Sequence, residues 1–183
     1  MKRVHVLDAR SMARALERMA AEILEQVREE GKLYLVGIQT RGVPLAHRLA
    51  RLIAASLGQA PPVGALDISL YRDDVGPWRP AHQQPVLRAT KLPESINGKL
   101  VCLVDDVLYT GRTVRAALDT LMDYGRPQAI RLAVLMDRGH RELPIAADFV
   151  GRTIPTGPDE DVQVRLQETD GEEGVWIARE DEA

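Results

Sequence analysis

The sequence contains one cysteine, Cys102, few aromatic residues (4%) and no apolar run long enough to cross a membrane. A single cysteine excludes an intrachain disulfide and a metal cluster built on cysteines. Residues 1–4 do not lead into the apolar core of a signal peptide. With 183 residues, 45% of them hydrophobic, we expect one soluble, cytoplasmic domain spanning 1–183, with an aliphatic core and no membrane partner.

Lysine is also scarce: the lysines are Lys2, Lys32, Lys91 and Lys99. Arginine supplies the rest of the Lys and Arg total. The net charge of −3 excludes a chain that is basic throughout, as many nucleic-acid-binding proteins are. The planar guanidinium fork suits recognition of phosphate groups. An arginine bias of the genome explains the composition more simply, so composition alone assigns no ligand.

The most informative stretch is residues 101–113, VCLVDDVLYTGRT. An apolar run, residues 100–104, ends in the adjacent acids Asp105 and Asp106, and a helical pattern starts at Val114. Between them lies a polar loop made of Tyr109, Thr110, Gly111, Arg112 and Thr113. Hydroxyl and N–H groups at a helix start bind phosphate, and paired carboxylates accept hydrogen bonds from ribose hydroxyls, directly or through Mg²⁺. The stretch therefore indicates a site for a phosphorylated sugar.

The loop fits neither GxGxxG nor GxxxxGK[ST], which disfavours nicotinamide and P-loop chemistry. The alternative is an ordinary strand-to-helix connection in which Thr110 or Thr113 caps the helix. Capping does not require two acids directly ahead of the loop, so we favour the ligand site.

A second polar connection, residues 39–42, contains Thr40, Arg41 and Gly42. It lies between an apolar run, residues 33–38, and a helix that Pro44 is expected to open. A connection of this kind faces a helix N-terminus and can bind an anion. The alternative is a plain strand-to-helix turn.

Strand and helix patterns alternate along the chain, which predicts an α/β fold with a mostly parallel, doubly wound sheet and ligands at its carboxyl edge. Helices are expected at about 12–29, from Pro44 to Gly58 and after Thr113. Strands are expected at 4–7, 33–38, 63–71, 87–92, 100–104 and 130–136, with an antiparallel hairpin formed by 162–166 and 175–178. Residues 72–85 lack periodicity, and a loop of that length is usually functional or disordered.

The stretch 101–113 resembles the phosphoribosyl-pyrophosphate (PRPP) loop of the type I phosphoribosyltransferases. This resemblance implies that Asp105 and Asp106 meet the ribose hydroxyls and that residues 109–113 hold the 5′-phosphate. Pyrophosphate would then meet Thr40, Arg41, Gly42 and Arg72, the last from a flap loop at about 70–88. It further implies PRPP as substrate with Mg²⁺, held mainly through the substrate and in part by Asp105 or Asp106.

Most of the chain resembles the bacterial pyrimidine-operon regulators that are also uracil phosphoribosyltransferases; the stretches LVGIQTRGVPLAHRLA, DISLYRDD and MDRGHRELPIAADFVGRTIPT carry this likeness. It implies formation of UMP from uracil and PRPP. Uracil would lie near Arg138 and Val162, beneath a small C-terminal hood and hairpin at about 150–180. Purine transferases usually have a carboxylate at the position of Tyr109, so its absence disfavours a purine acceptor. The alternative is a purine-type salvage enzyme without RNA binding.

The same resemblance implies UMP-dependent binding to the leader of pyrimidine-biosynthesis mRNA and attenuation of transcription. It also implies that the RNA-binding residues of this chain include Arg18, His140, Arg141 and Arg152. Ala21, Gln26 and Ala146 stand where other members carry basic residues, which predicts weaker phosphate contact. A solvated surface of ion-paired arginines is the alternative. The resemblance implies a homodimer, or a tetramer or hexamer built from it.

Overall fold

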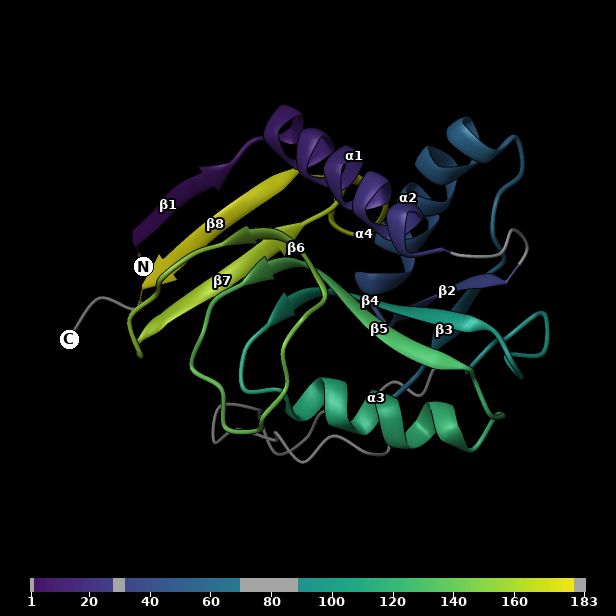
Figure 1. The fold of residues 1–183 in the computed structure, drawn as a ribbon. Coiled ribbons are helices and arrows are strands. Elements are labelled where there is room, and N and C mark those ends of the chain that lie inside the picture. Colours follow the sequence, from purple (N-terminus) through teal and green to yellow (C-terminus); the bar gives the residue numbers. More distant parts are fainter. Residues whose placement is uncertain (1, 28–31, 70–88, 180–183) are drawn as a thin grey trace.

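The computed structural model describes residues 2–27, 32–69 and 89–179, and its centre is a parallel sheet in the order β3-β2-β4-β5-β6. The strands are β2 (Leu33–Ile38), β3 (Val63–Leu66), β4 (Leu100–Leu108), β5 (Ala129–Asp137) and β6 (Phe149–Thr153). Helices α1 (Ala9–Gln26) and α2 (Gly42–Leu57) cover one face, and α3 (Arg112–Met122) covers the other (Figure 1). The doubly wound parallel sheet expected from the sequence is confirmed.

The helix ends follow local chemistry. The side chain of Asp8 caps α1 by accepting a hydrogen bond from the Ser11 N–H at 2.7 Å, so the helix starts slightly earlier than predicted. Helix α2 starts at Gly42, two residues before Pro44. It ends as predicted at Gly58, whose φ of 75° lies in the left-handed region that favours glycine.

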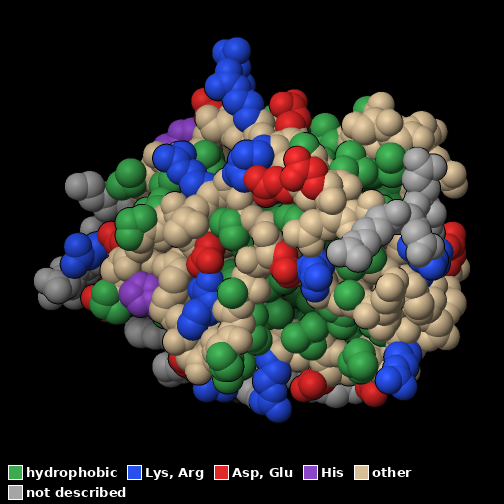
Figure 2. All heavy atoms as spheres, in the orientation of Figure 1, with side chains coloured by type: hydrophobic (Ala, Val, Ile, Leu, Met, Phe, Trp, Pro, Cys, Tyr) green, Lys and Arg blue, Asp and Glu red, His purple; other side chains and the backbone are tan. Residues whose placement is uncertain are grey.

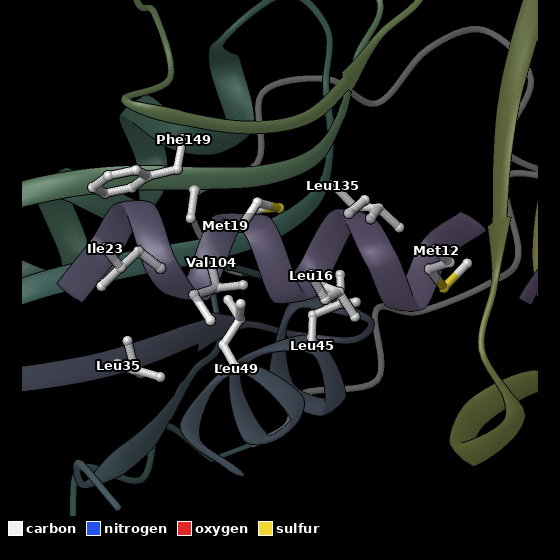
Figure 3. Close-up of a cluster of buried hydrophobic side chains, with 14 of the residues drawn as sticks. Met12, Leu16, Met19, Ile23, Leu35, Leu45, Leu49, Val104, Leu135 and Phe149 are labelled. Atoms are coloured by element: carbon white, nitrogen blue, oxygen red, sulfur yellow. The ribbon is translucent and has the colours of Figure 1, made fainter. Parts of the chain in front are cut away.

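Two apolar clusters, one on each face, hold the layers together. On one face, Leu16, Met19 and Ile23 of α1 point toward side chains of α2 and the sheet, including Leu49 and Val104 (Figure 3). On the other face, α3 packs its apolar stripe on the sheet through Val114, Ala117 and Leu121. Burying one large aliphatic side chain stabilises the fold by about 1.5–3 kcal/mol, so both helices are fixed against the sheet.

Strand β4 is longer than its apolar run. The sequence predicted that it stops before Asp105, but in the structure it continues to Leu108. Asp105 pairs with Val134 and Leu108 pairs with Asp137, because β5 offers hydrogen-bonding partners along the whole length. The two acids therefore belong to a central strand, and the polar loop begins only after Leu108.

A smaller antiparallel sheet lies beyond the carboxyl ends of the central strands (Figure 1). It consists of β1 (Lys2–Leu7), β7 (Glu160–Arg165) and β8 (Gly174–Arg179) in the order β1-β8-β7. The predicted C-terminal hairpin is confirmed, with the one-turn helix α4 (Gln167–Asp170) between its strands. The N-terminal strand adds to this hairpin, which no local pattern indicated.

The predicted strand at 63–71 is shorter in the structure, since β3 ends at Leu66. Of the predicted strand at 87–92, the described part makes only an isolated antiparallel bridge from Lys91 to Ala65. The flap at about 70–88, with Arg72, lies outside the described residues. Within the described ranges, no helix combines the length and apolarity needed to cross a bilayer.

Candidate functional site

The acid pair lies near the carboxyl end of β4. Asp105 is 6% exposed, and its Oδ1 accepts a hydrogen bond from the Asp106 N–H at 2.9 Å. Asp106 accepts one from the Val107 N–H, also at 2.9 Å. Burial raises the pKa of the Asp106 carboxyl, while the bond from Asp105 and the charge of Arg41 oppose the shift. A partner that brings hydroxyl donors or a cation would stabilise the ionised pair.

The loop from Tyr109 to Gly111 turns β4 into α3. Gly111 caps the helix with a φ of 93°, so neither Thr110 nor Thr113 is the cap. The N–H groups of Thr113 and Val114 belong to the first helical turn, where no preceding helical carbonyl is available to them. The helix dipole adds partial positive charge at the same place. This loop can therefore bind a phosphate through backbone N–H groups and the hydroxyls of Thr110 and Thr113.

The side chain of Arg112 turns away to an ion pair. Its Nε donates to Glu142 Oε2 at 2.6 Å, and its side chain is 43% exposed. The backbone N–H of Arg112 donates to Thr110 Oγ1 at 3.3 Å. Arg112 thus helps to shape the predicted phosphate loop, and Glu142 holds its guanidinium.

The second loop, between β2 and α2, contains a cis peptide bond between Gln39 and Thr40. Arg41 follows and donates twice to Asp170, from Nε at 3.0 Å and from Nη2 at 2.7 Å. This pair holds the pKa of the Asp170 carboxyl well below its ordinary value. Gly42 lies directly against the backbone of β4 at Val104.

One cavity of about 340 Å³ brings the predicted residues together. Its lining includes residues of the acid pair, of both loops and of the predicted uracil site: Thr40, Arg41, Asp105, Asp106, Tyr109, Thr110, Gly111, Thr113, Arg138 and Val162. Most of these residues come from the carboxyl ends of β2, β4 and β5, which parallel-sheet topology gathers at one edge. Val162 comes from β7 of the antiparallel sheet. Asp161, which the sequence did not single out, also lines it.

Arg138 joins the phosphate loop to the C-terminal hairpin. It is 6% exposed, and its guanidinium carbon lies 4.0 Å from the centre of the Tyr109 ring. Its Nε donates to Thr156 Oγ1 at 3.2 Å, and its Nη2 donates to the carbonyl of Glu160. A buried arginine with these partners fixes the ring and the segment that forms one wall of the cavity.

The four residues predicted to bind RNA occupy two places. Arg18 of α1 donates to the carbonyl of Val150, and Arg152 donates to the carbonyl of Val6, so both lie near β6. His140 and Arg141 lie in the loop after β5, where His140 Nε2 is 2.7 Å from the Thr156 carbonyl oxygen. On the face shown in Figure 2, described basic and acidic side chains are interspersed.

The guanidinium of Arg141 is directed inward. It donates to the carbonyls of Tyr109 at 2.9 Å, Gly139 at 3.0 Å and Ile145 at 3.0 Å, and it pairs with Asp137. These contacts tie the loop after β5 to the phosphate loop. Arg141 therefore has a structural task that its place in the sequence did not indicate, and Arg18 and Arg152 are better probes of RNA contact.

Asp170 contacts a residue of the site, and nothing in the sequence indicated it. It is 129 residues from Arg41 in the chain and occupies a one-turn helix of ordinary polar composition. No periodicity or spacing marks it, because only the folded chain brings α4 to the loop after β2.

The chain is similar to known proteins over nearly its whole length. The model of the phosphoribosyl transferase domain matches residues 4–169. The chain is 58% identical over 176 residues to the bifunctional protein PyrR of Pelotomaculum thermopropionicum, covering 96% of both chains. It is 54% identical over 175 residues to that of Thermus aquaticus, covering 96% of this chain and 95% of the other.

Solved structures agree on the fold. The hypoxanthine phosphoribosyltransferase of Trypanosoma cruzi in complex with IMP has a TM-score of 0.71 at 19% identity, covering 96% of this chain and 93% of that one. A hypoxanthine-guanine phosphoribosyltransferase of Bacillus anthracis has a TM-score of 0.69 at 18% identity, covering 96% of each. At such identities the likeness concerns the fold alone. The match of the domain model over residues 4–169 and the relatives of 54–58% identity show that the chain belongs to the phosphoribosyltransferase family and, within it, to the PyrR proteins.

Proposed function

We propose that this protein forms UMP and diphosphate from uracil and PRPP, and that UMP controls its binding to the leader of pyrimidine-biosynthesis mRNA. The cavity carries the first part of the proposal, because it joins Asp105 and Asp106 to a phosphate loop on one side and to Arg41 on the other. PRPP has the matching order of groups: a 5′-phosphate, two ribose hydroxyls and a pyrophosphate on C1.

The residues divide the work of displacing pyrophosphate. Thr110, Gly111 and Thr113 fix the 5′-phosphate, and the acid pair orients the ribose through its hydroxyls. As the bond from C1 to pyrophosphate breaks, positive charge develops on the sugar and negative charge on the leaving group. Arg41 faces the leaving group, so its attraction for pyrophosphate grows as charge separates. The site therefore binds the transition state more tightly than the ground state, which accelerates the reaction.

The donor set of the site suits Mg²⁺, which prefers carboxylate and phosphate oxygens. Asp105 or Asp106 would hold it together with PRPP oxygens. Within the described residues, no group of three or more acidic, histidine or cysteine side chains is arranged to hold a metal ion, so the substrate would supply most ligands. When bound, the ion neutralises charge on the departing pyrophosphate.

Base choice provides the test of the enzyme. We expect UMP from uracil, and little product from hypoxanthine, guanine or adenine, because Tyr109 occupies the position where purine transferases usually place a carboxylate. Its ring is stacked on the buried guanidinium of Arg138. The measurement is nucleotide formation from each base with PRPP and Mg²⁺. A purine product formed as fast as UMP would favour the purine-salvage alternative.

The RNA function has a physical route from the nucleotide site. His140 is exposed, contacts the Thr156 carbonyl, and has its ring 6.1 Å from that of Tyr109 in an edge-on arrangement. A nucleotide that orders Tyr109 and the wall around Thr156 would thus also order His140. Coupling of this kind is reciprocal, so UMP and leader RNA would tighten each other's binding by the same factor. We propose a homodimer as the RNA-binding form.

Arg152 tests the RNA surface. Arg152→Gln should weaken UMP-dependent retention of leader RNA and reduce the slope of log K against log salt by about 0.7–0.9, the share of one phosphate contact. The matched control is Arg115→Gln, since Arg115 is an exposed arginine of α3 that is not among the residues predicted to bind RNA. Retention is measured at several salt concentrations with and without UMP. An equal loss of RNA retention in both variants would show that Arg152 does not contact the RNA.

A further inference from the structure

The contact between Arg41 and Asp170 links the C-terminal hairpin to the pyrophosphate loop. Arg41 lines the cavity, whereas Asp170 is not among the described residues that line it. The Asp170 side chain is 7% exposed and receives both Nε and Nη2 of Arg41. It also accepts hydrogen bonds from Arg165 Nη1 at 3.1 Å and from the Leu166 N–H at 2.9 Å. The carboxylate is therefore held in place from its own side.

Resting on the proposed function, we propose that Asp170 is a positioning residue, which fixes the Arg41 guanidinium in the orientation needed for the pyrophosphate of PRPP. A bidentate pair sets the plane of the guanidinium, because two parallel hydrogen bonds allow little rotation. The pair occupies the Nε–Nη2 edge of the fork and leaves Nη1 outside it. The Arg41 side chain is then ordered before PRPP binds, so binding does not carry the entropy cost of ordering it.

Ordering one long side chain on binding weakens affinity by roughly two- to tenfold. Asp170→Asn should therefore raise the KM for PRPP and the Kd for inorganic pyrophosphate by about that factor, and leave the KM for uracil nearly unchanged. A simple loss of negative charge near the site would do the opposite, because it would strengthen attraction of pyrophosphate. The direction of the change thus separates positioning from charge.

The same turn supplies a matched control. Glu173 receives a bidentate pair from Arg48 of α2, at 2.6 and 2.9 Å, and a hydrogen bond from the Gln167 N–H at 2.9 Å. Arg48 is outside the cavity lining and also pairs with Glu168, so Glu173→Gln removes a bidentate contact near α4 without touching the pyrophosphate loop. Both variants should lower the melting temperature, but only Asp170→Asn should change the KM for PRPP.

A double-mutant cycle completes the test. In an Arg41→Gln background, Asp170→Asn should add no further rise in the KM for PRPP, because it acts through Arg41. An undiminished rise there, a fall in KM, or an equal change from Glu173→Gln would overturn the inference. Should Asp170→Asn melt too low for assay, Asp170→Glu displaces the carboxylate by one methylene and should shift the KM in the same direction.

Calorimetric titration with PRPP and with pyrophosphate, without any base, separates this inference from the proposed function. Failure of the unmodified protein to use uracil would overturn the enzyme proposal, while a weaker affinity of Asp170→Asn for PRPP would still support positioning. Unchanged affinity in Asp170→Asn would overturn the positioning role, even if uracil is turned over.

Discussion

Replacing Asp105 and Asp106 together by asparagine is expected to lower kcat/KM for PRPP by roughly 10²–10⁴-fold. Each carboxylate is proposed to accept a hydrogen bond from a ribose hydroxyl, and hydrogen bonds to charged groups contribute about 1.5–3 kcal/mol each. Loss of both removes about 3–6 kcal/mol of orientation and charge stabilisation. The rate is measured as release of diphosphate with uracil, PRPP and Mg²⁺.

The fold of this variant should persist. Asparagine keeps the shape of aspartate, and its amide oxygen can still accept the backbone N–H bonds at Asp105 and Asp106. Burial raises the pKa of the Asp106 carboxyl, so a neutral side chain avoids the same desolvation. The control is Asp119→Asn with Asp123→Asn, which changes the net charge equally at exposed positions of α3 and its C-cap. Near-normal turnover in the Asp105 and Asp106 variant would refute the ribose assignment.

Gly42→Ala should have the largest effect on stability. A Cβ at this position would clash with the Val104 carbonyl oxygen and would lie 3.4 Å from the Asp105 Cα. Both are backbone atoms of the central strand, so neither can move aside as a flexible side chain would. We expect a loss of about 3 kcal/mol in the free energy of unfolding, at the upper end for overpacking. The melting temperature should fall by roughly 6–12 °C.

The displaced loop would carry Thr40 and Arg41 with it, so PRPP binding should weaken in the same variant. Gly157→Ala is the control for stability, because its Cβ would meet nothing closer than 3.7 Å, and that neighbour is the side chain of Glu160. Thermal unfolding and PRPP titration provide the two measurements. If the Gly42→Ala variant has the same melting temperature as the unmodified protein, the loop can shift freely away from β4.

The fold class and the two loops could be predicted because local patterns specify them. The apolar run at 33–38 became β2 with the same bounds, since a strand buried on both faces leaves little choice of residue. Gly58 ended α2 because glycine reaches the left-handed conformation without strain. The acids and the polar loop after β4 indicated a phosphorylated sugar through residue chemistry alone. Parallel topology then brought both loops to one cavity.

Other features depended on partners distant in the sequence. Strand β4 continued through Asp105 because β5 pairs with it, which overrode the polar character of the residues. Arg141 turned inward because carbonyls of the phosphate loop lie within its reach.

The sequence by itself determined the family of this protein and pointed to two candidate ligand loops, because the residue types of those loops carry the chemistry. Only the tertiary structure decided which arginines line the cavity and which hold the framework. Arg41 and Asp170 stand 129 residues apart, and Arg48 and Glu173 stand 125 apart. The partner of a long, charged side chain is set by geometry between elements, and no periodicity along the chain records it.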